Sequence, residues 1–505
     1  MTTALADALA TAAIRTPQRV LLIDEDVRLD AAGTDRAART LAAALLRRFE
    51  PGSVVSFMLP NWHEAAIVYL GATLAGMVVN PILPSLRDRE LRYILEDTAA
   101  AMIVIPGLYR GHDYPAMLAR VTADLPTPPE VVVVRGDDTG FTGYHGLFSG
   151  TPLVTLPGVD PDAVALLLYT SGTTAAPKGV LHSQRGLRAL LTQIGRYWRV
   201  EDGDTFLVAS PIAHIGGSIY AFEAPLLLGS TAVLMQRWDP DAAVALIQTH
   251  RCTHMAGATP FLTGLLDAAR RFGSRLPELK VFICGGASVP PSLVLDATDY
   301  FDKAVVTRVY GSTEVPVTTV GSPDPGDTEH AAHTDGRAGI AELRIVDGEI
   351  RCRGPQMLLG YRNARDTADA FDDDGFFRTG DLGRIDDGYL VVTGRCKDLI
   401  IRNGENISPK EIEDLLATAP GIGEVAVVGI PDPRTGERAC AVIVPDDRAP
   451  VPDLAALRTA LTDAGLALFK VPERVEIWES LPRNDAGKIL KQQIRATLCP
   501  QTREG

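Results

Sequence analysis

The sequence predicts an α/β protein: a large N-terminal domain of doubly wound αβ sheets plus a β-rich subdomain, then a small mobile C-terminal α+β lid domain. Three observations lead to this prediction. Strand-like and helix-like segments alternate as far as Val309, hairpin-like segments fill residues 321–365, and a separate mixture of both follows Asp398. A chain of 505 residues is also too long for one ordinary core. We place the boundary between residues 1–396 and 397–505.

The first segments carry the expected alternation of strands and helices. A short strand pair at 19–24 and 28–30 precedes a helix at 36–49, and residues 53–59, 65–76 and 77–80 then read as strand, crossover helix and strand. A helix at 89–97 and a strand at 101–105 repeat the pattern. The next region, 126–157, is dense in Gly and Pro, so we expect a long surface connection there.

The stretch from Leu166 to Val180 is the centre of the sequence. An apolar strand pattern ends at Tyr169, and hydroxyl residues and glycine follow before Lys178. Backbone N–H groups, hydroxyls and one lysine can surround phosphoryl oxygens. A Walker P-loop is excluded because Pro177 stands in place of its second glycine and Gly179 in place of its Mg-binding Ser/Thr. A Ser/Thr/Gly-rich surface linker is the alternative.

A second group of candidates lies between the next predicted elements. We expect helices at 186–197, 240–250 and 260–270 and strands at 253–257, 280–284 and 304–309. His214 lies among prolines and glycines, which indicates a loop tip, and a structural role for it is the alternative. Ser218, Tyr220 and Glu223 follow it and are either pocket residues or ordinary helix residues.

Two of these strands end in residues suited to a nucleotide. The strand at 280–284 runs into Gly285, Gly286, Ala287 and Ser288, where a flat ligand could lie against bare backbone; a tight turn is the alternative. The strand at 304–309 runs into Tyr310, Gly311, Ser312, Thr313 and Glu314. These supply an aromatic face, a hydroxyl for phosphate and a carboxylate that suits Mg²⁺ beside a triphosphate.

The later segments add an aspartate and a terminal lysine. Asp347 and Gly348 mark a hairpin turn, and Asp381 follows a turn in Phe377–Leu382, where it could accept both hydrogen bonds from ribose hydroxyls. The lid is expected to contain helices at 409–417 and 453–464 and strands at 424–430, 439–444 and 474–479. Lys488 follows Pro482 and an Asn-Asp-Ala-Gly turn; solvated surface residues are the alternative for both side chains.

Composition and charge exclude several classes of function. The net charge of −14, without a long Arg/Lys cluster, argues against a nucleic-acid partner. Six scattered cysteines show no zinc or disulfide spacing and fit a reduced cytoplasm. The first thirty residues show no signal peptide, and the apolar run 65–79 is interrupted and too short for a membrane span. We expect a cytoplasmic monomer or homodimer that uses no membrane.

Five motifs together resemble the adenylate-forming superfamily of acyl-CoA synthetases, peptide-synthetase adenylation domains and luciferases. They are the Tyr-Thr-Ser-Gly-Thr-Thr and Pro-Lys-Gly loop, the segment around His214, the strand ends at 285–288 and 310–314, the block from Phe377 to Glu413, and the Pro-x-x-x-x-Gly-Lys pattern ending at Lys488. The resemblance covers most of residues 53–490. Ala175 departs from the family's usual glycine, so this loop should be stiffer than most.

The resemblance implies a role for each matching residue. Lys488, His214 and Lys178 would be catalytic, Glu314 would bind Mg²⁺, and Lys397 would be the hinge. His214, Ser218, Gly285 and Gly311 would line the acid pocket, and Gly404, Glu405 and Asn406 the CoA tunnel. The residues that would bind ATP or AMP are Thr170, Ser171, Gly172, Thr173, Thr174, Gly286, Ala287, Ser288, Tyr310, Gly311, Ser312, Thr313, Asp381 and Arg395.

These roles imply an acid–CoA ligase that uses Mg²⁺ with ATP and CoA as cosubstrates. The enzyme would convert a carboxylic acid to an acyl adenylate and then transfer the acyl group to CoA. The block 400–413 is closest to ligases for medium-chain, alicyclic or aromatic acids. Other acceptors, such as a carrier-protein thiol or an amine, a luciferase-like oxygenase and a small inorganic oxyanion as substrate are the alternatives. The acid itself is not specified.

Overall fold

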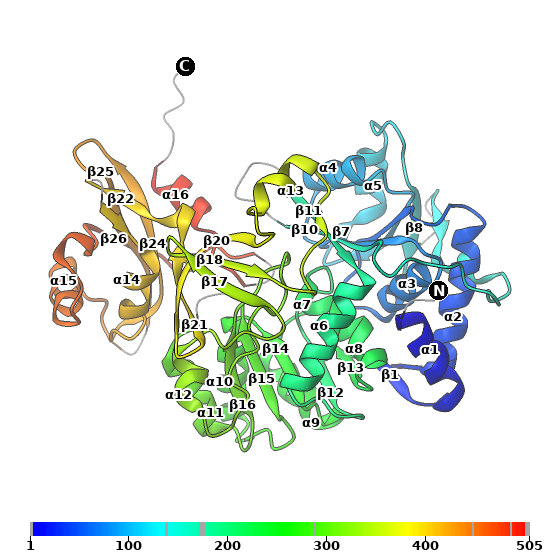
Figure 1. The fold of residues 1–505 in the computed structure, drawn as a ribbon, viewed down its shortest axis with the longest axis horizontal. Helices are drawn as coiled ribbons and strands as arrows, with labels where there is room; N and C mark the ends of the chain where they lie inside the picture. Colours follow the sequence, from blue (N-terminus) through cyan, green and yellow to red (C-terminus); the bar gives the residue numbers. More distant parts are fainter. Residues whose placement is uncertain are drawn as a thin grey trace.

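The computed structural model describes residues 4–136, 140–170, 177–286, 289–403, 405–446, 449–484 and 487–499. Figure 1 shows a large unit built from the earlier part of the chain and a smaller unit at its left, built from the segments coloured orange and red. Two mainly parallel sheets and a smaller antiparallel sheet form the large unit. A five-stranded sheet with three α-helices forms the small one. The predicted fold class is confirmed.

An eight-stranded sheet contains the strands on either side of the candidate phosphate loop. At one edge of this sheet the pairs β19–β11 and β11–β10 are antiparallel, and the other neighbouring pairs are parallel. In spatial order its strands are β19 (Gly360–Tyr361), β11 (Lys178–Ser183), β10 (Val164–Thr170), β4 (Val78–Pro81), β3 (Val54–Phe57), β5 (Met102–Pro106), β8 (Glu130–Val134) and β9 (Thr142–Gly143).

A seven-stranded sheet carries the two glycine- and tyrosine-containing strand ends. All its neighbouring pairs are parallel except β1 and β2, which form a hairpin. In spatial order its strands are β16 (Val305–Val309), β15 (Val281–Gly285), β14 (His254–Gly257), β12 (Thr205–Val208), β13 (Thr231–Leu234), β1 (Val20–Asp24) and β2 (Val27–Asp30).

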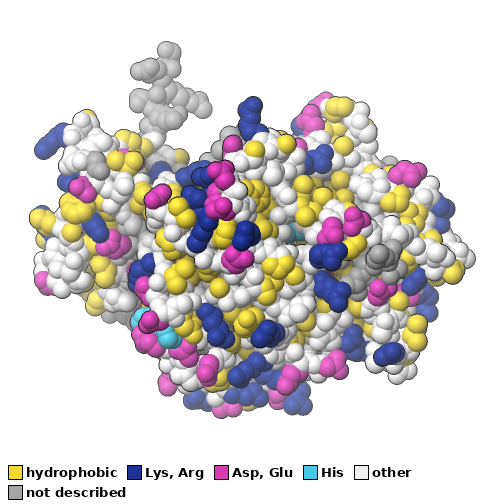
Figure 2. All heavy atoms as spheres, viewed as in Figure 1, with side chains coloured by type: hydrophobic (Ala, Val, Ile, Leu, Met, Phe, Trp, Pro, Cys, Tyr) yellow, Lys and Arg dark blue, Asp and Glu magenta, His cyan; other side chains and the backbone are white. Residues whose placement is uncertain are grey.

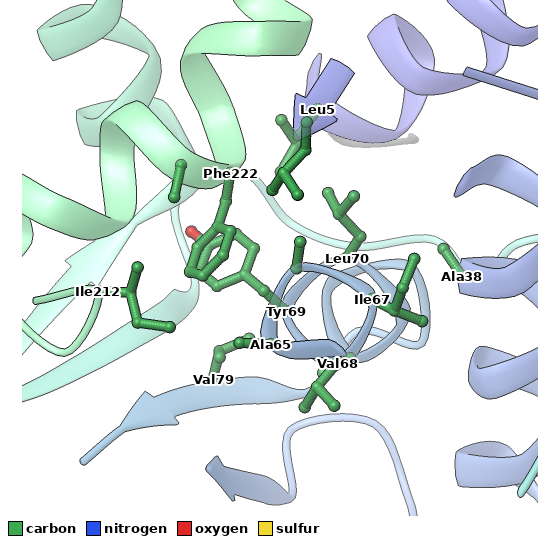
Figure 3. Close-up of a cluster of buried hydrophobic side chains, with 14 of the residues drawn as sticks. Leu5, Ala38, Ala65, Ile67, Val68, Tyr69, Leu70, Val79, Ile212 and Phe222 are labelled. Atoms are coloured by element: carbon green, nitrogen blue, oxygen red, sulfur yellow. The ribbon is translucent and has the colours of Figure 1, made fainter. Parts of the chain in front are cut away.

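Helices of the large unit pack on these sheets, and α3 is the most deeply buried of them. Every residue from Glu64 to Leu74 is buried, as expected for a helix that is apolar all round. In Figure 3, Tyr69 of α3 lies against Phe222, while Ile67 and Leu70 point to other sides of the helix. The helices are α1 (Ala4–Arg15), α2 (Ala31–Leu46), α3 (His63–Leu74), α4 (Asp88–Thr98), α5 (Tyr114–Thr122), α6 (Gln184–Tyr197), α7 (Ile215–Ser218), α8 (Ala224–Leu227), α9 (Pro240–His250), α10 (Thr259–Arg271), α11 (Pro291–Tyr300), α12 (Thr328–His333) and α13 (Ala364–Ala370).

The antiparallel sheet forms the last part of the large unit. Asp347 and Gly348, both with positive φ, make the predicted turn between its first two strands. Its strands, in spatial order, are β17 (Glu342–Val346), β18 (Glu349–Arg353), β20 (Phe377–Asp386) and β21 (Tyr389–Arg395). A small hairpin of β6 (Leu108–Tyr109) and β7 (His112–Asp113) lies apart from it. Asp381, which we expected after a turn, lies within strand β20 and follows Gly380, whose φ is 70°.

The small unit, here called the lid, has its own core. Successive residues of β24 face opposite sides of its sheet, so Val427 packs with α14 and α15 residues and Val428 packs with Ile494 of α16. The short helix η3 (Cys396–Asp398) connects β21 to the lid, which contains β22 (Ile400–Arg402), β23 (Glu405–Ile407), α14 (Pro409–Leu416), β24 (Ile422–Asp432), β25 (Gly436–Pro445), α15 (Leu454–Asp463), η4 (Leu468–Lys470), β26 (Arg474–Ile477) and α16 (Lys491–Leu498).

Two expectations were wrong: residues 328–333, expected among hairpins, form helix α12, and residues 126–157 are not simply a surface connection. Residues Val131–Val134 form most of strand β8 and are buried, and η1 (Tyr144–Phe148) packs two further side chains inward. Proline and glycine on both sides hid this four-valine strand in the sequence. Strands β12 and β13, to which the sequence analysis assigned no element, complete the seven-stranded sheet. Each helix in the described ranges is too short or too polar to cross a bilayer.

A buried carboxylic acid lies in the segment that follows α7. Residues Ile219–Glu223 form a π-helical turn (η2), and Glu223 within it is 1% exposed. Its Oε1 accepts a hydrogen bond from the Tyr69 hydroxyl, and Oε2 has no partner among the described residues. Burial raises the pKa of Glu223 from 4.5 to about 7, although the bond from Tyr69 acts in the opposite direction.

We predict that Glu223→Gln stabilises the protein increasingly as pH rises from 5 to 7.5. The stability that Glu223 contributes is present below its unfolded pKa of 4.5 and is lost as pH rises through about 7, because the unfolded chain releases the proton first. A neutral glutamine avoids this loss, worth on the order of 2 kcal/mol. Thermal denaturation of both proteins over this range measures it; a melting-temperature difference that does not change with pH would contradict the assignment.

Candidate functional site

The candidate residues lie where β10 and β16 end and where β11 begins. Thr170 is the last residue of β10, and Tyr310 directly follows β16. β10 and β16 belong to different sheets, and ligands of α/β proteins bind at the carboxyl ends of such parallel strands. Seven predicted residues lie outside the described ranges and cannot be placed: Ser171, Gly172, Thr173, Thr174, Ala287, Ser288 and Gly404.

Lys178, the first residue of β11, contacts a carboxylate and an aromatic ring. Its Nζ lies 2.6 Å from Oδ1 of Asp366 in α13 and 5.1 Å from the centroid of the Tyr361 ring in β19. The Tyr361 hydroxyl donates a 2.8 Å hydrogen bond to Oε1 of Glu314. Tyr361 therefore connects Lys178, on one side of the phosphate loop, to the predicted metal carboxylate.

Tyr310, Asp381 and Arg395 form a second connected group. The Tyr310 hydroxyl donates a 2.8 Å hydrogen bond to Oδ2 of Asp381, and Nε of Arg395 lies 2.7 Å from Oδ1. Asp381 and Arg395 face each other in the register of β20 and β21, so the sheet itself holds this pair together. Burial, followed by the charge of Asp381, raises the pKa of Tyr310 well above its usual value.

Lys488 enters this group from the lid. Its backbone N–H donates a 2.8 Å hydrogen bond to Oδ1 of Asn484, which fixes the turn that carries it. Gly487 has φ 80°, and a Cβ built on it would lie 3.3 Å from Cγ of Pro260 and 3.8 Å from Cβ of Ala258. The turn is therefore docked against the start of α10 in the large unit.

The charge on Lys488 depends on this docking. Withdrawal from solvent, and then the charge of Arg395, lower the pKa of Lys488 from 10.5 to about 8. The carboxylates of Asp381, Asp398 and Glu314 act in the opposite direction. Lys178 and Lys488, 310 positions apart in the sequence, thus both lie near groups that contact or face Glu314, and their catalytic roles stay predictions.

The other lid residues predicted to be functional lie elsewhere. Lys397 is exposed in η3, between the last strand of the large unit and the first strand of the lid. Glu405 and Asn406 are exposed side chains on β23. In this conformation the lid presents Lys488 to Asp381 and Glu314, and the roles of Lys397, Glu405 and Asn406 stay predictions.

His214 is the N-cap residue of α7, at the tip of a tightly held loop. Asn61 holds this loop through three hydrogen bonds: its Nδ2 donates to the carbonyls of Val208 and Ser210, and its Oδ1 accepts from the Ile212 N–H. The missing Cβ of Gly217 lets its backbone approach the Pro211 carbonyl. Ser218 is buried behind His214 and donates to the Ile215 carbonyl at 3.3 Å.

The candidate glycines have different surroundings. A Cβ at Gly285 would lie 2.8 Å from the Val309 carbonyl, and one at Gly311 would lie 2.7 Å from the Val317 N–H. Both glycines are therefore required by the packing of the protein itself, whatever they line. Gly286 has φ 81° with open space where a Cβ would be, so its backbone is accessible to a flat ligand.

The loop from Gly311 to Glu314 is anchored from the neighbouring sheet. Oγ of Ser312 accepts a 3.2 Å hydrogen bond from the Val315 N–H. Nε2 of His182, a buried residue of β11, lies 2.8 Å from the Thr313 carbonyl. Burial lowers the pKa of His182 to about 4, so the ring is neutral and donates its Nε2 proton. This contact holds the carbonyl of Thr313, not its hydroxyl, and the phosphate-binding role of that hydroxyl stays a prediction.

Sequence reasoning missed four residues that organise the site: Asn61, His182, Tyr361 and Asp366. Asn61 interrupts an apolar segment and His182 directly follows one, which is the signal of a buried polar group with a specific partner. Asp366 lies on α13, which has no buried residue and hence no periodic pattern. Its pairing with Lys178 depends on a contact across 188 positions of the sequence.

Chemically, the arrangement is suited to a polyanion beside a second anion. Lys178, Lys488 and Arg395 supply positive charge, while Glu314 and Asp381 supply carboxylates that can bind a cation or hydroxyl groups. The positive charge is local, because basic and acidic side chains are interspersed over the face seen in Figure 2.

Comparisons with known proteins identify the family of the chain. The family described as "AMP-binding enzyme" matches residues 9–362, and the family "AMP-binding enzyme C-terminal domain" matches residues 411–488. The first match contains the phosphate loop, His214, and Tyr310–Glu314. The second ends at Lys488.

Relatives match over nearly the whole chain. A medium-chain fatty-acid–CoA ligase of Escherichia coli K12 is 34% identical over 92% of this chain and 85% of its own length. A 3-[(3aS,4S,7aS)-7a-methyl-1,5-dioxo-octahydro-1H-inden-4-yl]propanoyl:CoA ligase of Rhodococcus jostii is 34% identical over 97% of both chains. ATP-bound MatB of Rhodopseudomonas palustris superimposes with a TM-score of 0.87 and 29% identity, over 98% of this chain and 99% of that one.

We predict that Lys488 titrates near pH 8 in the nucleotide-free protein. Arg395→Gln should raise this pKa, because it removes a repelling charge, and Asp381→Asn should lower it. The pH dependence of Lys488 modification by an amine reagent, followed by peptide mass spectrometry, measures all three. A midpoint near the ordinary value of 10.5 in the unsubstituted protein would mean that the lid turn is not docked.

Proposed function

Because the chain belongs to the AMP-binding enzyme family, we propose that it is an AMP-forming acid–CoA ligase. It activates a carboxylic acid with ATP to an acyl adenylate and pyrophosphate, and then transfers the acyl group to CoA with release of AMP. The observation that carries this proposal is the docking of Lys488 beside Asp381, Arg395 and Glu314. A lid lysine in that place has a role only if a negatively charged reaction centre forms between the two units.

The first step joins two anions. A carboxylate oxygen of the acid attacks the α-phosphorus of ATP, a P–O bond forms, and the bond to the pyrophosphate oxygen breaks. The carboxylate is already deprotonated, so no general base is needed. The barrier falls when fixed positive charge stabilises the charge that gathers on the phosphoryl oxygens. We assign this role to Lys488, with Lys178 drawing charge toward the departing pyrophosphate.

The nucleotide is held by groups from both large sheets and from the antiparallel sheet. Asp381 is proposed to accept hydrogen bonds from the ribose hydroxyls, while Arg395 keeps its carboxylate oriented. The backbone at Gly286 and the ring of Tyr310 are proposed to flank the adenine. His214, held by Asn61, is proposed to form the wall between the acid and the α-phosphate.

Glu314 fits the role of a Mg²⁺ ligand. Mg²⁺ in such sites takes one or two carboxylates together with substrate phosphates and water. Oε1 of Glu314 accepts a hydrogen bond from Tyr361, which orients the carboxylate and leaves Oε2 for a cation. A bound Mg²⁺ would neutralise charge on the triphosphate. Thr170, Ser312 and Thr313 are proposed to donate their hydroxyls to the phosphates.

The second step needs a different lid position. The thiol of CoA gives its proton to water and attacks the acyl carbon as a thiolate; the C–S bond forms, the C–O bond to the phosphate breaks, and AMP leaves with that bond's electron pair. Lys488 is docked against the large unit in the present conformation, so we propose that for this step the lid rotates about Lys397, withdraws Lys488 and brings Glu405 and Asn406, with Gly404, to the thiol path. The exposed position of β23 in the present conformation is compatible with such a rotation.

The acid is proposed to be a hydrophobic carboxylic acid of the medium-chain, alicyclic or aromatic type. Two observations support this choice: the ligase relatives described above and the resemblance of block 400–413 to such enzymes. Ser218, Gly285 and Gly311 are proposed to line its pocket together with His214. A cytoplasmic location and a monomeric or homodimeric state stay predictions from the sequence.

A pyrophosphate-release screen tests the proposed function. We expect pyrophosphate from ATP only in the presence of an accepted acid, and acyl-CoA only when CoA is added. Each acid of the panel is measured with CoA, with an amine and with no acceptor, so another acceptor would be recognised directly. An enzyme that forms no AMP and pyrophosphate with any acid would contradict the proposal.

We predict that Lys488→Ala nearly abolishes pyrophosphate release, by two orders of magnitude or more, yet spares thioester formation from added acyl adenylate. Lys491→Ala is the matched control, because Lys491 lies in the same segment but pairs with Glu413 at 2.7 Å within the lid. Single-turnover assays of each half-reaction measure the effect. Loss of both half-reactions to a similar degree would refute the assigned role of Lys488.

A further inference from the structure

Residues 360–370, here called the counter-ion arm, contact the strand that follows the predicted phosphate loop and, through Asp97, are linked to the strand that precedes it. The arm consists of β19 and α13. After the loop, the Arg362 N–H donates a 2.8 Å hydrogen bond to the Gly179 carbonyl. Before the loop, the Tyr169 hydroxyl bonds the Asp97 carboxylate, and Nε of Arg362 donates to the Asp97 carbonyl at 2.5 Å. The arm thus contacts β11 directly and is linked to β10 through Asp97.

The same arm supplies partners to both charged groups that the proposed function places on the triphosphate. Asp366 pairs with Lys178 at 2.6 Å, and Tyr361 bonds Glu314 at 2.8 Å. The side chains of Lys178 and Asp366 are 28% and 29% exposed, so water and ligands reach this pair. In the present conformation the lysine therefore already has a negatively charged partner.

We propose that Asp366 is a positioning residue whose carboxylate occupies Lys178 until nucleotide binds, and that phosphate oxygens then replace it. The inference rests on the proposed function, since it takes Lys178 to be a phosphate ligand. Asp366 prepares the lysine over the Tyr361 ring and at the same time opposes the triphosphate through its own charge. It thereby sets the affinity of the enzyme for ATP and pyrophosphate.

The argument depends on the charges of three groups. Lysine donates hydrogen bonds but acts on phosphate mainly as a point charge, and a carboxylate at 2.6 Å cancels most of that charge. A triphosphate next to Lys178 also brings like charge close to Asp366. Neutralising Asp366 should therefore strengthen nucleotide binding, by about three- to tenfold for a pair exposed to this degree.

The test is a mutant cycle on nucleotide binding. Isothermal titration with magnesium α,β-methylene-ATP, and separately with magnesium pyrophosphate, gives Kd for the unsubstituted enzyme, Asp366→Asn, Lys178→Gln and the double variant. We expect Asp366→Asn to lower both Kd values about three- to tenfold and to have no effect when Lys178 is already glutamine. The KM for ATP should fall in parallel, with the KM for the acid unchanged.

Two variants control for changes in structure. Asp369→Asn removes a carboxylate from the exposed face of the same helix, and Asp366→Glu keeps the charge at Lys178; both should retain the original Kd. Weaker or unchanged binding by Asp366→Asn, or tightening that persists without Lys178, overturns the inference. If the unsubstituted enzyme bound neither probe, the proposed function would itself fail; if it binds and only the cycle fails, the inference alone is wrong.

Discussion

The position of Lys488 depends on one constraint: an amine withdrawn from water keeps its charge only while carboxylates face it. Here the carboxylates belong to the large unit and the lysine belongs to the lid. Docking of the turn on Ala258 and Pro260 places the amine among Asp381, Asp398 and Glu314, and the resulting pKa near 8 leaves it largely protonated at neutral pH. The charge of Lys488, which we propose to be catalytic, therefore lies among these carboxylates only in this arrangement of the two units.

The rest of the fold serves to bring distant segments to that point. The eight-stranded sheet provides the two strands that flank the predicted phosphate loop, the seven-stranded sheet provides Gly286 and Tyr310, and the antiparallel sheet provides Asp381 and Arg395 as facing residues. Tyr361 and Asp366 join these contributions from the counter-ion arm. Because each sheet contributes a rigid strand end, the site can be precise while the lid that covers it remains a separate unit with its own core.

The sequence predicted the parts with a local pattern and missed those defined by tertiary contact. Helix 240–250 and the hairpin turn at Asp347 follow from proline placement, periodicity and a turn dipeptide, and the structure has them at those positions. Strand β8 was missed because proline and glycine flank a short buried run. The meeting of Lys488 with Glu314 came from family resemblance, since no spacing rule joins residues so far apart. The pairing of Asp366 with Lys178 left no trace in the sequence, because α13 is exposed throughout.

A reversible disulfide across the docked lid tests the central claim most directly. A Cβ on Gly487 would lie 3.8 Å from Cβ of Ala258, within the range of disulfides, so Ala258→Cys with Gly487→Cys can lock the lid; Cys396→Ser removes an exposed thiol. The oxidised enzyme should release pyrophosphate but form no acyl-CoA, and reduction should restore the second step. If the oxidised enzyme formed acyl-CoA as fast as the reduced one, or if it lost only adenylation, the docked lid would not be the conformation of the first step.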